Sequence, residues 1–166
     1  MRSTILFHLQ KLNIILPIPS APVANYLPYT FTPDKDIIFI SGQLPIDNDQ
    51  VSYVGKIGEV YNLGDGQKAA RLCCINILSQ LQAACNGNLD IVSRCLKITG
   101  FVNATPNYTK HSQIINGASD LIVEVFGEQG MHARSVIGVS SLPFGVPVVV
   151  EAIFALKQPI TESKNL

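Results

Sequence analysis

The sequence predicts one α+β domain in which two helices cover one face of a β-sheet. Residues 61–88 and 112–127 repeat apolar side chains at helical spacing. Segments rich in β-branched residues, at 36–47, 90–104 and 132–156, read as strands. The Pro-rich passage at 16–30 is expected to be an extended arm, and the segment at 132–156 to hold two strands joined around "LPFG". We expect the order ββαβαββ, which is typical of a layered α+β fold. With 166 residues, the chain has the length of one ordinary domain.

The two predicted helices have recognisable ends. Asp65 lies near the start of the first helix and Gly87 lies just beyond its end, while Gly127 stops the second. Helices on one face leave the other face of the sheet to be covered by something else. The last strand, "VPVVVEAIFAL", has apolar side chains pointing both ways, as expected of a strand buried on both faces. We therefore expect another subunit to cover the second face.

The chain divides into an extension, a domain and a tail. Residues 1–20 are predicted to form an N-terminal extension with a short helix, residues 21–160 the domain, and residues 161–166 a tail. Lys11 and Asn13 interrupt the apolar N-terminal stretch, so it lacks the layout of a secretory signal. No window approaches the ~18 apolar residues that span a bilayer. We expect a cytoplasmic protein with no membrane partner.

The amino-acid composition indicates which kinds of partner and cofactor to expect. Charged residues make up 14% of the chain, against about 25% in typical soluble domains, which favours a surface partly hidden between subunits. The net charge is zero and lysines and arginines form no run, which argues against nucleic acid. The four cysteines form no Cys-x-x-Cys pair and the three histidines are widely spaced. We therefore expect buried thiols and no metal or other cofactor.

One arginine and one glutamate stand out in the apolar stretch "HARSVIGVSSLPFGVPVVVEAIFAL". Alternation along the first predicted strand places Arg134, Val136 and Gly138 on one face. Glu151 shares a face of the next strand with Val149. Because a guanidinium stays charged at physiological pH, Arg134 needs solvent or an anionic partner. Spacing leaves two interpretations open: a fork that binds a carboxylate ligand, or a structural salt bridge across an interface.

Five motifs in order connect the chain to a known family: "SAPVANYLPYT", "FISGQLPID", "ITGFVNA", "INGASDLIVEVFG" and "HARSVIGVSSLPFGVPVVVEAIF". Together, over residues 20–157, they resemble the Rid family, also called YjgF-like or endoribonuclease L-PSP, which contains reactive-intermediate deaminases. The resemblance implies a chorismate-mutase-like fold and a homotrimer with ligand clefts at the subunit seams. It also implies a small-molecule carboxylate as ligand, and hydrolysis of enamines or imines to a 2-keto acid and ammonia.

The same resemblance implies roles for particular residues. Arg134, in the "ARS" motif, matches the family's carboxylate-binding arginine. Ser41 and Gly42 match the serine and glycine of its "SGQ" motif, and Asn116 resembles an asparagine on the second helix. Tyr29 resembles the family tyrosine, with a slip of one residue in the spacing. These residues are the predicted substrate-binding set.

The chain departs from the family where proton transfer is expected. Val136 replaces a cysteine two residues after the arginine, and Val149 replaces a glutamate thought to activate water. Glu151 matches a second glutamate, and it is either a substitute catalytic group or a structural one. The resemblance thus keeps the carboxylate-binding residues and loses the acid–base residues.

Three functions follow from these observations. The first is a trimer that binds small carboxylates, with enamine or imine deaminase activity undecided. The second is a non-catalytic metabolite-binding or interaction trimer, which Val136 and Val149 favour. The third is an endoribonuclease, which would need a basic groove. The absence of clustered lysines and arginines makes it the weakest of the three.

Overall fold

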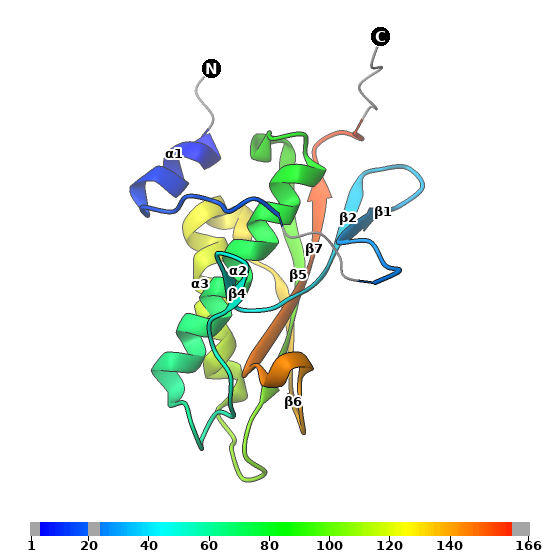
Figure 1. Cartoon of the computed structure of the whole chain (residues 1–166). Helices are drawn as coiled ribbons and strands as arrows, with labels where there is room; N and C mark the ends of the chain where they lie inside the picture. Colours follow the sequence, from blue (N-terminus) through cyan, green and yellow to red (C-terminus); the bar gives the residue numbers. More distant parts are fainter. Residues whose placement is uncertain (1–3, 20–23, 161–166) are drawn as a thin grey trace.

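A computed structural model describes residues 4–19 and 24–160, so the predicted tail at 161–166 lies outside it (Figure 1). The main sheet has five strands in the order β1-β2-β7-β5-β6. β5 and β6 are parallel, and the other neighbours are antiparallel. In chain order the strands are β1 Tyr29–Phe31, β2 Ile37–Gln43, β5 Val92–Asn103, β6 Ala133–Val139 and β7 Val148–Leu156.

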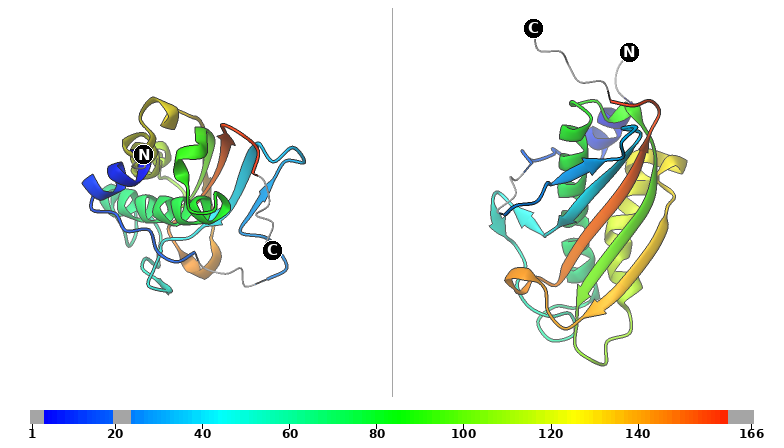
Figure 2. Two further views of the ribbon diagram at one scale, coloured as in Figure 1. Left: turned by 90° about the horizontal axis from the view of Figure 1, so that it is seen from above. Right: turned by 90° about the vertical axis from the view of Figure 1, so that its right-hand side faces the viewer.

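Two long helices, α2 (Leu63–Ala84) and α3 (His111–Phe126), cover one face of this sheet (Figure 2). Asn62 and Asp65 form a reciprocal capping box at the start of α2, which explains the helix-start signal in the sequence. α3 ends at Gly127, whose φ of 61° suits glycine. The main sheet and these two helices follow the predicted order ββαβαββ.

The N-terminal segment packs on the helical layer. Helix α1 (Thr4–Lys11) lies within the predicted N-terminal extension, and it buries Ile5 and Leu9 in the core. The end of the predicted extended arm becomes the edge strand β1. A small hairpin, β3 (Ile46–Asp47) and β4 (Gln50–Val51), lies beside α2. Among the described residues no helix is both long and apolar enough to cross a bilayer.

The core lies between the helices and the covered face of the sheet, and all four cysteines are buried. Burial raises the pKa of Cys85 and of Cys95 to about 12, so both remain thiols at neutral pH. Because the thiolate is the reactive form of cysteine, these side chains act as small hydrophobic groups. The sequence prediction for the cysteines is confirmed.

The two closing strands form as predicted, but they are not neighbours. They are joined through the 3₁₀ turn η3 (Pro143–Gly145), and β5 lies between them in the sheet. Short connections commonly join consecutive strands that pair with each other. Instead β6 pairs parallel with β5, a long-range contact that sequence alone does not indicate. The other 3₁₀ turns are η1 (Leu89–Ile91) and η2 (Gly127–Gly130).

Candidate functional site

The strand register places Arg134 and Glu151 on opposite faces of the sheet. Arg134 is paired with Ile98, which is fully buried under the helices. Glu151 is paired with Thr99, and both line the face that the helices leave open. Two side chains on opposite faces of one sheet do not share a site within a single chain. Two regions therefore need separate description.

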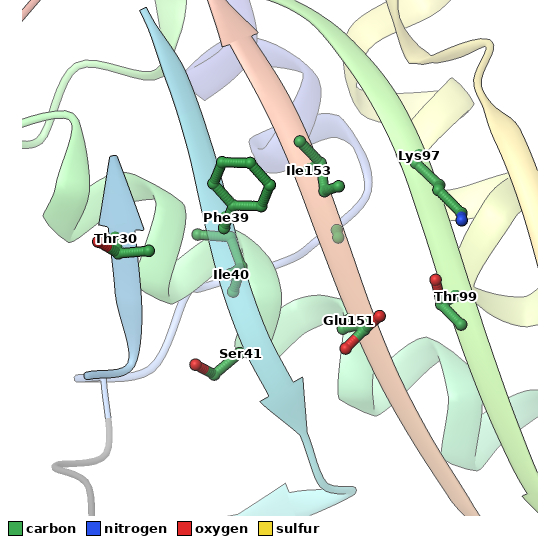
Figure 3. Close-up of a pocket in the computed structure, with 9 residues that line it drawn as sticks. Thr30, Phe39, Ile40, Ser41, Lys97, Thr99, Glu151 and Ile153 are labelled. Atoms are coloured by element: carbon green, nitrogen blue, oxygen red, sulfur yellow. The ribbon is translucent and has the colours of Figure 1, made fainter. Parts of the chain in front are cut away.

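The open face carries a shallow depression of about 240 Å³ (Figure 3). Its polar lining comes from four strands, with Glu151 lying between Ser41 and Thr99 in the close-up. The face is also apolar, because Phe39 is 42% exposed and Ile137 is 50% exposed. The polar side chains that line the depression are Thr30, Ser41, Lys97, Thr99 and Glu151. Within one chain, this face therefore exposes charged and apolar groups together.

Arg134 lies on β6, which is the edge strand farthest from β1, and residues of α3 hold its side chain. Its Nη1 donates to Asn116 Oδ1 at 2.9 Å and to Ser119 Oγ at 3.1 Å. Both acceptors are uncharged, so neither neutralises the guanidinium. Arg134 and Asn116, two of the predicted substrate-binding residues, are therefore in direct contact. We call Arg134, Asn116, Ser119 and His132 the β6-edge cluster.

The hydrogen bonds leave a defined part of the guanidinium for a ligand. Nη1 has two hydrogens, and the two bonds to α3 engage both. The hydrogen bonds from Arg134 to the described residues all start at Nη1. The edge formed by Nε–H and the nearer Nη2–H matches the spacing of two carboxylate oxygens. Because the Arg134 side chain is exposed, solvent and small anions reach this edge.

Ser41 and Gly42 lie in a β-bulge of β2, where the register with β7 shifts between Ile40 and Gln43. The Ser41 hydroxyl donates to the Leu27 carbonyl at 2.7 Å. A Cβ built at Gly42 would lie 2.9 Å from Val149 Cγ1, so the valine packs directly against the glycine backbone. Val149 is only 9% exposed. An aliphatic contact therefore occupies the position where the resemblance implies a water-activating carboxylate.

Tyr29 lies far from Arg134 in the same chain. β1 and β6 are the two edges of the sheet, four strand spacings or roughly 19 Å apart. Tyr29 pairs with Ile40 and packs edge-on against Phe31, with ring centroids 5.9 Å apart. Of the predicted substrate-binding residues, one chain brings Arg134 and Asn116 together. Ser41 and Gly42 adjoin each other on β2, and Tyr29 lies beside them on the paired strand β1, so these three form a second group.

Sequence reasoning missed two members of the β6-edge cluster, Ser119 and His132. Ser119 follows Asn116 by three residues, which places both on one face of α3. His132 Nε2 is 3.0 Å from Ser119 Oγ, and its Nδ1 is 2.6 Å from the Gly130 carbonyl. The helical spacing could have indicated Ser119. Among the described residues, no group of three His, Cys, Asp or Glu side chains could hold a metal ion.

Comparison with known proteins decides the family. The family model described as "YjgF/chorismate mutase-like, putative endoribonuclease" matches residues 8–156. The chain belongs to this family. The predicted membership is therefore confirmed, together with the chorismate-mutase-like fold.

Several YjgF-like relatives match over most of their length. Protein TCP17 of Trypanosoma cruzi is 44% identical over 150 residues, which cover 90% of this chain and 92% of that protein. The crystal structure of Atu1372 from Agrobacterium tumefaciens, of unknown function, has a TM-score of 0.85 and 38% identity, and covers 92% of both chains. A structure from Shewanella oneidensis has a TM-score of 0.88 and 30% identity, covering 93% of this chain and all (100%) of the other.

Proposed function

We propose that this protein binds small carboxylate-bearing metabolites at Arg134, in clefts between the subunits of a homotrimer. The observation that carries the proposal is the state of the guanidinium. Arg134 is exposed and its guanidinium is charged. Two uncharged side chains on α3 accept hydrogen bonds from Nη1, and neither bond uses the Nε–Nη2 edge. A planar fork of this kind recognises carboxylates with two parallel hydrogen bonds.

The positions of the other predicted residues support a site shared between subunits. Ser41, Gly42 and Tyr29 lie on β1 and β2 at one side of the sheet, and Arg134 lies on the edge strand at the other. They can surround one ligand only if the β1–β2 side of one copy meets the β6 edge of the next. Such a head-to-tail contact forms a closed ring when the rotation between neighbouring copies is one third of a turn, as we propose here. Three copies would also cover the open face, where Phe39 and Ile137 are exposed.

The site favours binding over acid–base chemistry. Val149 packs against the Gly42 backbone, and Val136, also apolar, lies two residues along β6 from Arg134. Neither side chain can transfer a proton or polarise water. Glu151, the remaining candidate catalytic group, lies on the face opposite to Arg134 in the same chain. A carboxylate ligand would thus be bound firmly without a nearby general base from these positions.

Hydrolysis of enamines or imines is the second candidate, and the retained Arg134–Asn116 pair favours it. In this reaction water adds to the C=N carbon, and the resulting carbinolamine expels ammonia to leave a 2-keto acid. Imines hydrolyse slowly without a catalyst, so orientation of the substrate alone gives some acceleration. General acid–base help would add about 10²- to 10⁴-fold. The endoribonuclease named in the family description remains the weakest candidate, because the net charge is zero.

The binding proposal is tested by calorimetric titration of 2-oxobutanoate and of its primary amide. The amide has the same shape and no negative charge, so it is the matched control ligand. We expect the acid to bind at least tenfold more tightly than the amide, and Arg134→Ala to abolish the difference. Light scattering on both proteins should give the mass of three chains. Equal affinity for acid and amide in the wild-type trimer would refute the proposal.

The catalytic candidate needs a separate assay. An amino-acid oxidase generates the imine in place, and the release of keto acid is followed with and without this protein. Acceleration that disappears in a trimeric Arg134→Ala variant would establish hydrolysis. No acceleration with several imines, together with measurable binding of 2-oxobutanoate, would establish a binding protein.

A further inference from the structure

A continuous chain of hydrogen bonds connects Arg134 with three further polar groups. Arg134 Nη1 is 3.1 Å from Ser119 Oγ, and Ser119 Oγ is 3.0 Å from His132 Nε2. His132 Nδ1 is 2.6 Å from the carbonyl oxygen of Gly130, in the turn η2. Ser119 and His132 are both half-buried, whereas Arg134 is exposed. The chain therefore runs from the protein interior to the exposed guanidinium.

Chemistry fixes the direction of each bond in this chain. A backbone carbonyl only accepts, so His132 Nδ1 carries the ring proton and donates to Gly130. In the neutral ring Nε2 is then an acceptor, and the Ser119 hydroxyl donates to it. That hydroxyl oxygen is left to accept from Arg134 Nη1. Each group has one role, and none competes for the same hydrogen.

We infer that Ser119 and His132 are positioning residues that lock the guanidinium of Arg134 with its Nε–Nη2 edge turned outward. This inference rests on the proposed function, because it explains how the ligand-binding fork is oriented. Asn116 supplies the first fixed point, and Ser119 supplies the second. Two fixed points on one nitrogen define the plane of the guanidinium. His132 acts through Ser119, because it holds the serine hydroxyl in the rotamer that presents a lone pair to Arg134.

These hydrogen bonds matter because little else around Arg134 on β6 restrains its side chain. Its neighbours along the strand, Ala133 and Ser135, are exposed, and β6 is an edge strand. An unrestrained arginine side chain loses rotamer entropy when a ligand immobilises it. Immobilising the side chain before the ligand arrives removes part of that cost from the binding step. We therefore expect the cluster to increase affinity without touching the ligand.

The test measures the lock without any ligand. In ¹⁵N NMR of the full-length protein, a restrained guanidinium shows slowed rotation about its Nε–Cζ and Cζ–Nη bonds. The chain has only four arginines, and Arg134→Lys identifies the signal of Arg134. We expect slow rotation in the wild type, and fast rotation in Ser119→Ala and in His132→Ala. Ser119→Thr keeps the hydroxyl and His132→Gln keeps an acceptor, so both should restore slow rotation.

A titration with 2-oxobutanoate then connects the lock with binding. Loss of one hydrogen bond to a preorganised group corresponds to about a fivefold weaker affinity, which we expect for Ser119→Ala. A smaller loss is expected for His132→Ala, which acts one bond further away. The exposed Ser52, in the loop after the small hairpin, gives the matched control Ser52→Ala, which should change neither readout.

The outcomes separate this inference from the proposed function. Fast rotation of Arg134 in the wild type, or slow rotation that survives both alanine substitutions, would overturn the lock. Slow rotation that depends on Ser119 and His132 in a protein that binds no carboxylate would refute the proposed function, and would support the positioning role alone. If Ser119→Thr restores both slow rotation and wild-type affinity, the result would support the positioning role and the proposed function together. A general folding defect would not be repaired by one hydroxyl.

Discussion

The β6 edge and the bulge of β2 differ in which residues of the family pattern they retain. At the β6 edge, Arg134 is held by polar side chains of α3 and retains an edge for a carboxylate. At the bulge, Gly42 lies against Val149, and the contact is aliphatic. Both regions belong to the ligand site that the family resemblance implies. We propose that the first recognises a charged ligand, whereas the second carries valine where the resemblance implies a group that transfers protons.

This difference separates binding from catalysis within one fold. A carboxylate can be recognised by geometry and charge at the β6 edge alone. Hydrolysis at a useful rate also needs a group that activates water, and valine cannot provide it. The two functions should therefore respond to different substitutions. The predictions below change one region at a time.

The largest effect is expected from restoring a carboxylate at the bulge. Val149→Glu should raise the rate of imine hydrolysis by about 10²-fold, because it supplies a general base. Val149→Gln has nearly the same volume and cannot act as a base, so it is the control. The oxidase-coupled assay measures both. Equal rates for the glutamate and glutamine variants would show that position 149 does not face the reacting ligand.

A smaller effect is expected from changing the fork and keeping the charge. Arg134→Lys retains a cation and loses the planar pair of donors, so affinity for 2-oxobutanoate should fall about tenfold. The variant also loses the geometry that engages Asn116 and Ser119. Calorimetry checks the affinity, and light scattering checks assembly. An unchanged affinity would mean that Arg134 acts only through its net charge.

The tight contact at the bulge predicts an interaction between two small substitutions. Gly42→Ala places a methyl group against Val149, so we expect a loss of about 1 kcal/mol in the free energy of unfolding. In the background of Val149→Ala, which removes the obstructing methyl groups, the same change should cost little. Urea denaturation of the four proteins completes the cycle. Additive losses would contradict the contact.

The smallest effect is expected on the open face. Glu151→Gln preserves size and removes the charge, and it should change the affinity for 2-oxobutanoate less than twofold, about 0.4 kcal/mol. The reason is that Glu151 faces away from Arg134 in its own chain, and the proposed partner half of the site consists of Ser41, Gly42 and Tyr29. Titration of the variant measures this directly. Loss of imine hydrolysis in Glu151→Gln would instead identify Glu151 as the substitute catalytic group.

Sequence was sufficient for the elements with strong local signals. The capping box at Asn62 and Asp65, the apolar stripe of α3 and its stop at Gly127 all follow from neighbouring residues. The insertion of β5 between β6 and β7 depends on pairing between distant segments, and no local pattern encodes it. The register of both strands with β5 then places Arg134 and Glu151 on opposite faces.

The candidate site was also only partly predictable from the sequence. Arg134 and Asn116 were found through motif resemblance, and the structure places them in contact. Ser119 and His132 were not found from the sequence. Their hydrogen bond joins a helix to a later loop, and it can be predicted only when the relative positions of the two elements are known. Tyr29 and Ser41 lie too far from Arg134 to complete its site in one chain. Their role depends on an assembly that a single chain does not define.

The most direct test of a carboxylate site between subunits is a mixing experiment. Arg134→Ala removes the β6 half of the site, and Ser41→Trp blocks the β2 half, so neither trimer alone should bind 2-oxobutanoate. In trimers formed from both chains at random, about a quarter of the sites combine two intact halves. Titration of the mixture should recover that fraction at wild-type affinity. No recovery in mixed trimers would contradict a shared site.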